Sequence, residues 1–290
     1  MKRKIAVAGY TGFIGSYIMP KLKDYGYEIK EIKKDHLIQR DVSKIVEAVN
    51  GCYAVINLSG VSINRRWTKR NKNLIWNSRI NSTEMIVKAI EMSINRPEIF
   101  INASGVDIYP VKRTCTEECA EKNDSFLGQV INDWERKADE AGRFNIRIVK
   151  TRFGVVLGNH GGVFNILRNV IKKLSGIVFG DGQQHMPVVH IEDVFRSIMF
   201  ILENNKLEGI FNVVAPEECR NIELIRKICE KFGRKVTLRI NDKILKLFVG
   251  ERSCLMLDDR VVIPKRLIDN GFRFKFKNIN EIIDDLIVIM

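Results

Sequence analysis

The stretch KIAVAGYTGFIG, residues 4–15, decides the fold. Its first part is a short apolar run typical of a buried strand, and residues 13–25 continue as a helix. Gly9 permits a tight turn, Gly12 lets the backbone approach a pyrophosphate, and Gly15 lets the helix pack on the strand. Any tight turn favours glycine, but here the strand, the helix and the N-terminal position agree. The motif therefore predicts a dinucleotide site with its phosphates at the helix N-terminus.

Strand-like runs alternate with helix-length segments through the first half of the chain. We expect a helix at residues 78–92 and strands at residues 4–9, 27–32, 53–60, 98–105 and 147–158. Such alternation predicts an α/β fold, a Rossmann-like, doubly wound parallel sheet with right-handed crossovers. The segment 27–32 is polar for a central strand, so its bounds are the least defined.

The alternation becomes irregular from about residue 159, where glycine-rich loops precede helical stretches at 222–232 and 243–248. We expect a Rossmann domain at 1–158, with part of its sheet continuing to about 215. Residues 159–290 then form a small, mostly helical C-terminal region on the substrate side, where doubly wound folds bind ligands.

The composition is that of an ordinary globular protein, with 290 residues, 45% hydrophobic and 29% charged. No apolar run approaches the ~18 residues of a membrane helix, and the basic start reaches Gly9 too soon for a secretory segment. We expect a cytoplasmic protein that does not bind membranes.

The net charge of +13 and the basic, aromatic-containing run at 64–79 raise the alternative of nucleic-acid binding. The lysines, however, are spread along the whole chain, and the apolar residues from Leu74 onward fit a helix with one buried face. A solvated basic surface without specific nucleic-acid binding is the simpler interpretation.

Six cysteines are scattered through the chain, and only Cys115 and Cys119, in CTEEC, lie close together. One such pair without further Cys or His ligands is a weak zinc signal. We therefore expect reduced thiols and no metal.

The end of the second strand indicates which dinucleotide binds. Lys33 and Lys34 present cations suited to a 2′-phosphate, which favours NADP, whereas Asp35 could serve the ribose hydroxyls of NAD. Simple solvation of both lysines, in so lysine-rich a chain, is the alternative, and it leaves NAD possible. We expect Asp41 beside the adenine, and the turn to contribute Thr11, Phe13 and Ile14 as well as its glycines.

The segments AGYTGFIG, NLSG, SRINST, NASGVDIY and RFGVVLG together resemble the extended short-chain dehydrogenase/reductase superfamily. More narrowly, FLGQVINDWE, VVLGNHGG, VVHIEDV, NVVAPEECRN and VIPKRLIDNGFRF are similar to an atypical branch of NAD(P)-dependent, epimerase-like proteins. That branch has its own C-terminal domain, here at about 237–285. The resemblance also places Leu58, Ser59 and Gly60 beside the cofactor.

The wider superfamily carries a tyrosine and a lysine four residues apart, where the tyrosine donates the proton and the lysine lowers its pKa. The resemblance puts Leu127 and Ile131 at these two positions, and neither can transfer a proton. We interpret both as core or pocket wall.

Three other residues are candidates for the chemistry. Ser104 matches the superfamily's carbonyl-polarising serine, and the alternative is an ordinary helix or turn cap. Tyr109 could act as the acid, but the branch has two adjacent tyrosines and a glycine there, and a buried, locally bonded tyrosine is as good an interpretation. His185 lies in a loop expected to face the pocket and has an ordinary pKa near neutrality.

We expect substrate contacts from Asn81, Arg152 and Gln184. His190 and Asp193 more often serve as a structural cap and orienting pair at a helix start. Extended members of the superfamily often form a homodimer through the helices that here carry Met85 and Trp134, but packing of these apolar faces within one chain is an equal alternative.

Two functions follow from these observations. The first is an NADP-dependent oxidoreductase or epimerase that acts on a small polar carbonyl or alcohol, with Ser104, Tyr109 or His185 handling the oxygen and its proton. The second is a non-catalytic NADP(H)-binding sensor or scaffold, which the loss of both ionisable residues at positions 127 and 131 favours.

Overall fold

A computed structural model describes residues 2–288 of the chain. The chain divides into two compact units, each made of three segments. The first unit contains the residues up to Ile108, Asp124–Arg152 and Ile198–Phe211, and the second contains Tyr109–Asn123, Phe153–Ser197 and the residues from Asn212 onward.

The first unit is built on a six-stranded parallel sheet with the strand order β10-β6-β4-β3-β1-β2. The strands are β1 (Lys4–Ala8), β2 (Glu28–Ile32), β3 (Ala54–Asn57), β4 (Ile99–Gly105), β6 (Arg147–Phe153) and β10 (Gly209–Val213). The chain crosses from β2 on one side of β1 to β3 on the other, so the carboxyl ends of β1 and β3 border a switch point where doubly wound sheets bind ligands. The predicted Rossmann-like sheet is confirmed.

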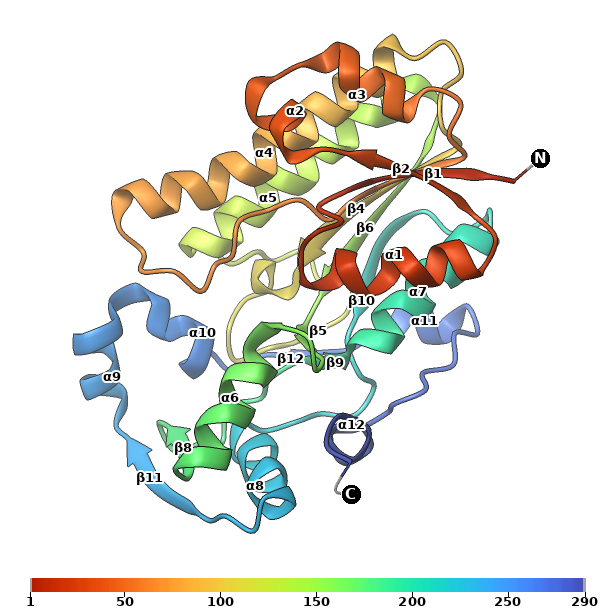
Figure 1. Ribbon diagram of the computed structural model, residues 1–290. Coiled ribbons are helices and arrows are strands. Elements are labelled where there is room, and N and C mark those ends of the chain that lie inside the picture. Colours follow the sequence, from red (N-terminus) through yellow and green to blue (C-terminus); the bar gives the residue numbers. More distant parts are fainter. Residues whose placement is uncertain (1, 289–290) are drawn as a thin grey trace. The chain divides into compact units, whose positions relative to one another are not determined.

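Helices cover both faces of this sheet (Figure 1). Helices α3, α4 and α5 lie on one face and α1 on the other. A core of aliphatic side chains from the sheet, α3, α4 and α5, including Ile45, Val55 and Ile86, is fully buried. The helices of this unit are α1 (Phe13–Asp24), α2 (Lys34–Gln39), α3 (Val42–Val49), α4 (Lys69–Met92) and α5 (Phe126–Asp139), and α7 (Ile191–Glu203) ends in it.

The second unit has short parallel strand pairs and its own core. The pairs are β5 (Thr114–Cys115) with β12 (Val261–Val262), β7 (Val155–Leu157) with β9 (Val188–His190), and β8 (Gly176–Phe179) with β11 (Val236–Ile240). Its helices are α6 (Gly162–Lys173), α8 (Asn221–Lys231), α9 (Asp242–Val249), α10 (Cys254–Leu257), α11 (Lys265–Asp269) and α12 (Ile279–Leu286). Apolar side chains of α6, α8 and α12, such as Phe164, Ile225 and Ile283, pack in one cluster.

The expected strand at 147–158 is two strands, β6 and β7, separated at Gly154. The Gly154 amide donates to the Val213 carbonyl, and β7 then pairs with β9 instead of continuing the large sheet. A Cβ atom at Gly154 would lie 2.8 Å from Val214 Cγ1 and 3.0 Å from the Pro187 carbonyl carbon. Only glycine allows so close an approach, and an apolar run alone does not reveal it.

Two other expectations needed correction. The helix expected at 78–92 begins at Lys69, because the Thr68 hydroxyl accepts a hydrogen bond from the Asn71 amide and caps the basic segment. Leu74 is 40% exposed, although we assigned it to the buried face, because it lies off the buried side of the helix that holds Ile75. The region after residue 159 also contains strands and further helices, in addition to the two helices that we expected at 222–232 and 243–248.

One buried ion pair joins α5 to β6 within the first unit. Arg152 Nε and Nη2 donate to the two carboxylate oxygens of Glu135, each at 2.7 Å, and both side chains are less than a tenth exposed. Burial raises the pKa of the Glu135 carboxyl, but the hydrogen bonds and charge of Arg152 outweigh it and hold the pKa below its ordinary value. The carboxylate is therefore charged at neutral pH.

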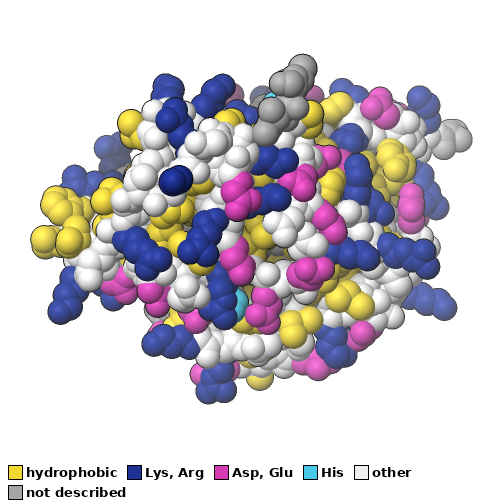
Figure 2. All heavy atoms as spheres, turned by 90° about the horizontal axis from the view of Figure 1, so that it is seen from below, with side chains coloured by type: hydrophobic (Ala, Val, Ile, Leu, Met, Phe, Trp, Pro, Cys, Tyr) yellow, Lys and Arg dark blue, Asp and Glu magenta, His cyan; other side chains and the backbone are white. Residues whose placement is uncertain are grey.

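Lysine and arginine side chains are interspersed with acidic ones on the face drawn in Figure 2. Within residues 2–288, no helix combines the length and the apolarity needed to cross a bilayer.

Replacing Gly154→Ala should destabilise the protein by about 1–3 kcal/mol, because the new methyl group overlaps Val214 and the Pro187 carbonyl. Urea denaturation measures the effect. Gly142→Ala is the matched control, since its Cβ atom would meet only Ile148 Cδ1, at 3.4 Å. Equal stability of the two variants would contradict the close approach at Gly154.

Replacing Glu135→Gln should cost about 3–5 kcal/mol at pH 7, because Arg152 would remain buried without a counter-charge. The folded-state pKa of Glu135 is depressed, so its contribution is present above about pH 4.3, the unfolded value, and is lost as pH falls through the folded pKa. Denaturation from pH 7 to pH 2 should show the two proteins converging in acid. The control is Glu140→Gln, which breaks the more exposed Lys137 pair and should cost at most about 1 kcal/mol.

Candidate functional site

The glycine loop has the geometry that a close backbone approach requires. Gly9 has a φ of +76°, in the region that favours glycine, and its Cβ atom would lie 2.5 Å from the Leu58 carbonyl carbon. At Gly15, a Cβ atom would lie 2.6 Å from Tyr10 Cα. The Gly12 amide donates to the Gly9 carbonyl at 3.0 Å and closes the turn.

Helix α1 begins without a side-chain cap. Gly12 is its N-cap residue and has no side chain to bond the first-turn amides, and the first turn has no acidic residue. Thr11 and Gly12 are exposed, Phe13 and Ile14 are partly exposed, and Gly15 is buried. Because the amides of a first helical turn favour anions, this end of α1 fits a pyrophosphate.

Lys33 and Lys34 lie directly after β2, next to β1 in the sheet. Lys33 is the N-cap residue of α2, and both side chains are exposed. Within residues 2–288, neither makes an ion pair, so both can meet a phosphate. Asp41 caps α3 instead, accepting hydrogen bonds from the Ser43 hydroxyl and the Lys44 amide. Both bonds lower the pKa of the Asp41 carboxyl, and the bond from Ser43 has the larger effect.

The NLSG segment follows β3 and is fixed by buried hydrogen bonds. The side-chain amide nitrogen of Asn57 donates to Thr83 Oγ1 at 2.9 Å and to Asn102 Oδ1 at 2.7 Å. Asn57 Oδ1 accepts a hydrogen bond from the backbone amide of Ser59. The Leu58 amide donates to the Ala8 carbonyl. This network holds the NLSG backbone against the glycine loop.

Arg79 of α4 lies beside Gly60, where a Cβ atom would be 3.1 Å from its guanidinium carbon. Its Nη1 donates to the carbonyls of Val61 and Ile75, and burial lowers its pKa to about 10. Asn81, one of the expected substrate residues, is only partly buried on the same helix.

Leu127 and Ile131 of α5 are buried, at 4% and 6% exposure. The side chain of Ile131 fills the space beside Gly105 at the end of β4, where a Cβ atom would lie 3.2 Å from Ile131 Cδ1. The helix therefore presents hydrocarbon at both positions where the superfamily has ionisable groups.

Ser104 is also buried, and its hydroxyl donates to Glu135 Oε1 at 2.5 Å. The same carboxylate pairs with Arg152, so both candidates belong to one network. In this arrangement the Ser104 proton is directed to Glu135, and the charge of Arg152 is balanced. Their assigned roles toward a carbonyl and a substrate stay predictions.

Tyr109 belongs to the second unit, where it is 1% exposed. Its hydroxyl donates to Asn212 Oδ1 at 2.8 Å, and the backbone amide of Asn212 donates to Glu117 Oε1 at 2.9 Å. This is the buried, locally bonded arrangement that we considered as the alternative to an acid.

His185 is oriented by an acidic partner in the second unit. The ring Nδ1 and the backbone amide both contact Asp259 Oδ1, at 2.8 and 2.9 Å, and Nε2 lies 3.3 Å from Glu218 Oε2. Burial raises the pKa of Asp259, but the bonds from His185 outweigh it and lower the pKa. Asp259 thus holds the ring at Nδ1, while Nε2 faces the Glu218 carboxylate.

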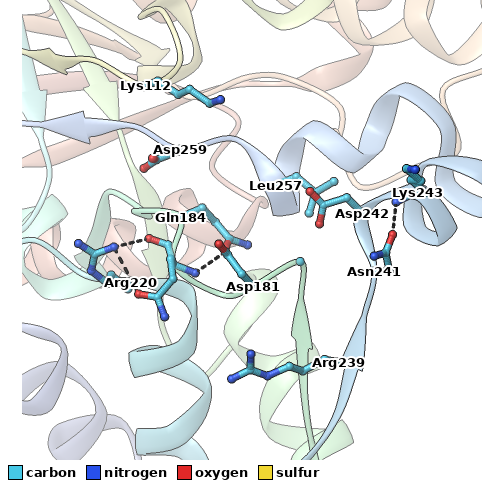
Figure 3. A pocket seen from close by; sticks show the side chains of 12 residues that line it. Lys112, Asp181, Gln184, Arg220, Arg239, Asn241, Asp242, Lys243, Leu257 and Asp259 are labelled. Carbon is cyan, nitrogen blue, oxygen red and sulfur yellow. Dashed lines mark hydrogen bonds between the residues drawn. The ribbon is translucent and has the colours of Figure 1, made fainter.

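A cavity of about 770 Å³ lies within the second unit, and Gln184 and Asp259 line it, whereas His185 itself does not. Strands β8 and β11 are parallel, so their carboxyl ends meet at one edge, and the residues that follow them line the cavity with the start of α8. Figure 3 shows Arg220 coming to it from the start of α8, and Arg239 and Asp242 coming from the segment where β11 ends and α9 begins. Its charged residues are Lys112, Arg220, Arg239, Lys243, Asp181, Asp242 and Asp259.

Gln184 lines this cavity and holds two segments together. Its side-chain amide donates to the Phe179 carbonyl at 3.1 Å and to the Met256 carbonyl at 2.6 Å. Sequence reasoning selected Gln184 and His185 but missed Lys112, Arg220 and Arg239. No motif marks these cations, because they come from three segments far apart in the sequence that only the tertiary structure brings to one cavity.

His190 and Asp193 make structural contacts. Asp193 accepts hydrogen bonds from the amides of Lys275 and Phe276, both at 2.8 Å, and His190 Nδ1 accepts one from the Glu192 amide. Burial lowers the pKa of His190 to about 4.

Comparison with known proteins identifies the relatives of this fold. Residues 5–214 match the model of the NAD dependent epimerase/dehydratase family, and residues 242–286 match a domain of unknown function, DUF1731. An epimerase family protein of Staphylococcus haemolyticus is 31% identical over 98% of this chain and 99% of its own. One from Staphylococcus aureus is 28% identical over the same shares.

Solved structures agree with this assignment. The human epimerase family protein SDR39U1, solved with NADPH, has a TM-score of 0.87 and 25% identity and covers 98% of both chains. MoeE5, in complex with UDP-glucuronic acid and NAD, has a TM-score of 0.80 over 98% of this chain and 97% of its own, but at 17% identity it shows the fold alone. The expected resemblance is confirmed, and the chain belongs to the NAD dependent epimerase/dehydratase family, with a C-terminal DUF1731 domain.

Proposed function

We propose that this protein is an NADP-dependent oxidoreductase or epimerase-like enzyme that acts on a small polar carbonyl or alcohol substrate. The observation that carries the proposal is the uncapped N-terminus of α1 beside two exposed lysines at the end of β2. A pyrophosphate fits the first and a 2′-phosphate fits the second. The NADPH in the SDR39U1 structure supports this cofactor.

The cavity of the second unit supports a substrate with an anionic group. Four cationic side chains line it against three acidic ones, and Arg239 and Lys243 have no ion pair within residues 2–288. A phosphate or carboxylate would complement these cations, while Asp181 and Asp242 can accept hydrogen bonds from hydroxyl groups.

We assign the transfer of the proton at the substrate oxygen to His185. When bound, NADP supplies or accepts hydride at the nicotinamide C4. His185 Nε2 would exchange its contact with Glu218 for the substrate oxygen and give or take the proton there, and Asp259 would hold the ring. Ser104 and Tyr109 donate to Glu135 and Asn212, so either would have to exchange its partner to act on a carbonyl.

A second function has an observation in its favour. Leu127 and Ile131 fill with hydrocarbon the positions of the usual acid and its lysine, as expected for a protein that binds NADP(H) without turning it over. Cofactor binding is common to both functions, and turnover separates them.

The double substitution Lys33→Ala/Lys34→Ala should weaken NADPH binding about tenfold or more, because each lysine contributes a charged hydrogen bond to the 2′-phosphate. NADH binding should not change. Nicotinamide fluorescence titrations with both dinucleotides measure this, and Lys23→Ala is the control for an exposed lysine elsewhere in the first unit. If the unchanged protein bound neither dinucleotide, both functions would be excluded.

The substitution His185→Asn should lower kcat by about 10²- to 10⁴-fold, the range of a general acid or base, and leave the Kd for NADPH unchanged. The assay follows NADPH oxidation with phosphorylated and carboxylated aldehydes and ketones. His160→Asn is the control for an exposed histidine. NADPH binding without turnover of any such substrate would favour the non-catalytic function.

A further inference from the structure

Cys115 and Cys119 form a close thiol pair in the second unit. Cys115 ends β5, where its carbonyl accepts a hydrogen bond from the Ile263 amide next to β12. The chain then turns back, with the Cys119 amide donating to the Thr116 carbonyl. This turn brings the two Sγ atoms to 2.7 Å.

This separation is close to bonding distance. A disulfide bond is about 2.05 Å long, so the sulfur atoms need approach by only about 0.7 Å more. A metal does not explain the pair, because no group of three or more His, Cys, Asp or Glu residues in the described part of the chain could hold one. The geometry suits oxidation of the two thiols to one cystine.

The loop between the cysteines is already anchored. The carboxylate of Glu117 is buried and accepts hydrogen bonds from the amides of Asn212 and Arg266. Because these bonds fix Glu117 at the centre of the loop, Cys115 and Cys119 at its two ends are held close together while both are still thiols. The loop also supports Tyr109, whose hydroxyl bonds Asn212.

We propose that Cys115 and Cys119 are a reversible redox site, which a small-molecule disulfide converts from a dithiol into an intramolecular disulfide. The Cys119 thiolate attacks one sulfur of the small disulfide, whose S–S bond breaks and releases a thiolate. Cys115 loses its proton to solvent and attacks the Cys119 sulfur, and the second small thiolate leaves. Two protein thiols are oxidised and one disulfide is reduced to two thiols.

The environments of the two cysteines fix this order. Cys119 is partly exposed, whereas Cys115 is 1% exposed. Burial, and then the neighbouring Cys119 thiol, raise the pKa of Cys115, which disfavours it as the first nucleophile. Once Cys119 carries the mixed disulfide, the attack by Cys115 is intramolecular and needs little movement.

The test is peptide mass spectrometry of the full chain. The protein is equilibrated with oxidised glutathione, quenched in acid, alkylated and cut with trypsin, which releases TCTEECAEK between Arg113 and Asn123 with both cysteines in one peptide. We expect this peptide to be lighter than the dithiol by two hydrogen atoms and to carry no alkyl group. Dithiothreitol should restore two alkylation sites.

Three variants separate the proposal from nonspecific oxidation. Cys115→Ser should leave Cys119 bearing glutathione, Cys119→Ser should leave Cys115 as a free thiol, and Cys254→Ser, which removes another partly exposed cysteine, should change nothing. Independent alkylation of both cysteines in the oxidised natural chain, or glutathione on each, would overturn the proposal. The readout needs no cofactor or substrate, so it is independent of the proposed activity.

Discussion

The buried Glu135–Arg152 ion pair is the interaction on which the centre of the first unit depends. Removing two charges from water is costly, and the bidentate geometry together with the Ser104 hydroxyl offsets this cost only while all three groups are in place. The network joins the end of β4, the middle of α5 and the end of β6. It therefore sets the position of the helix on which the superfamily carries its acid and lysine.

Helix α5 is held in place, but it lacks the ionisable side chains that the superfamily carries there. Ile131 packs against Gly105, and Leu127 is equally buried, so the surface that would present a tyrosine and a lysine is hydrocarbon. The glycine turn nevertheless keeps the close approach at Gly9, and α1 begins at Gly12 with no acidic residue in its first turn. The backbone geometry of the turn and the side chains of α5 are thus set by different residues.

The second unit contains the charged cavity, His185 and the thiol pair. Parallel pairing of β8 and β11 places charged residues around one cavity, and Asp259, which also lines it, holds the His185 ring. Glu117 fixes the loop that bears Cys115 and Cys119 and also supports the Asn212 partner of Tyr109. In this unit, short strands and buried carboxylates do the positioning that the large sheet does in the first.

The sequence alone determined the sheet, the glycine turn and the absence of an ionisable pair on α5, because these depend on local periodicity and on residue identity. It could not predict that the strand expected at 147–158 divides at Gly154, since the cause is the distant backbone at Pro187. Nor could it predict that Ser104 and Arg152 share Glu135, or that Lys112, Arg220 and Arg239 line one cavity. Those contacts join residues far apart in the chain, and only the tertiary structure decides them, because a hydrogen bond or an ion pair requires proximity that no local pattern encodes.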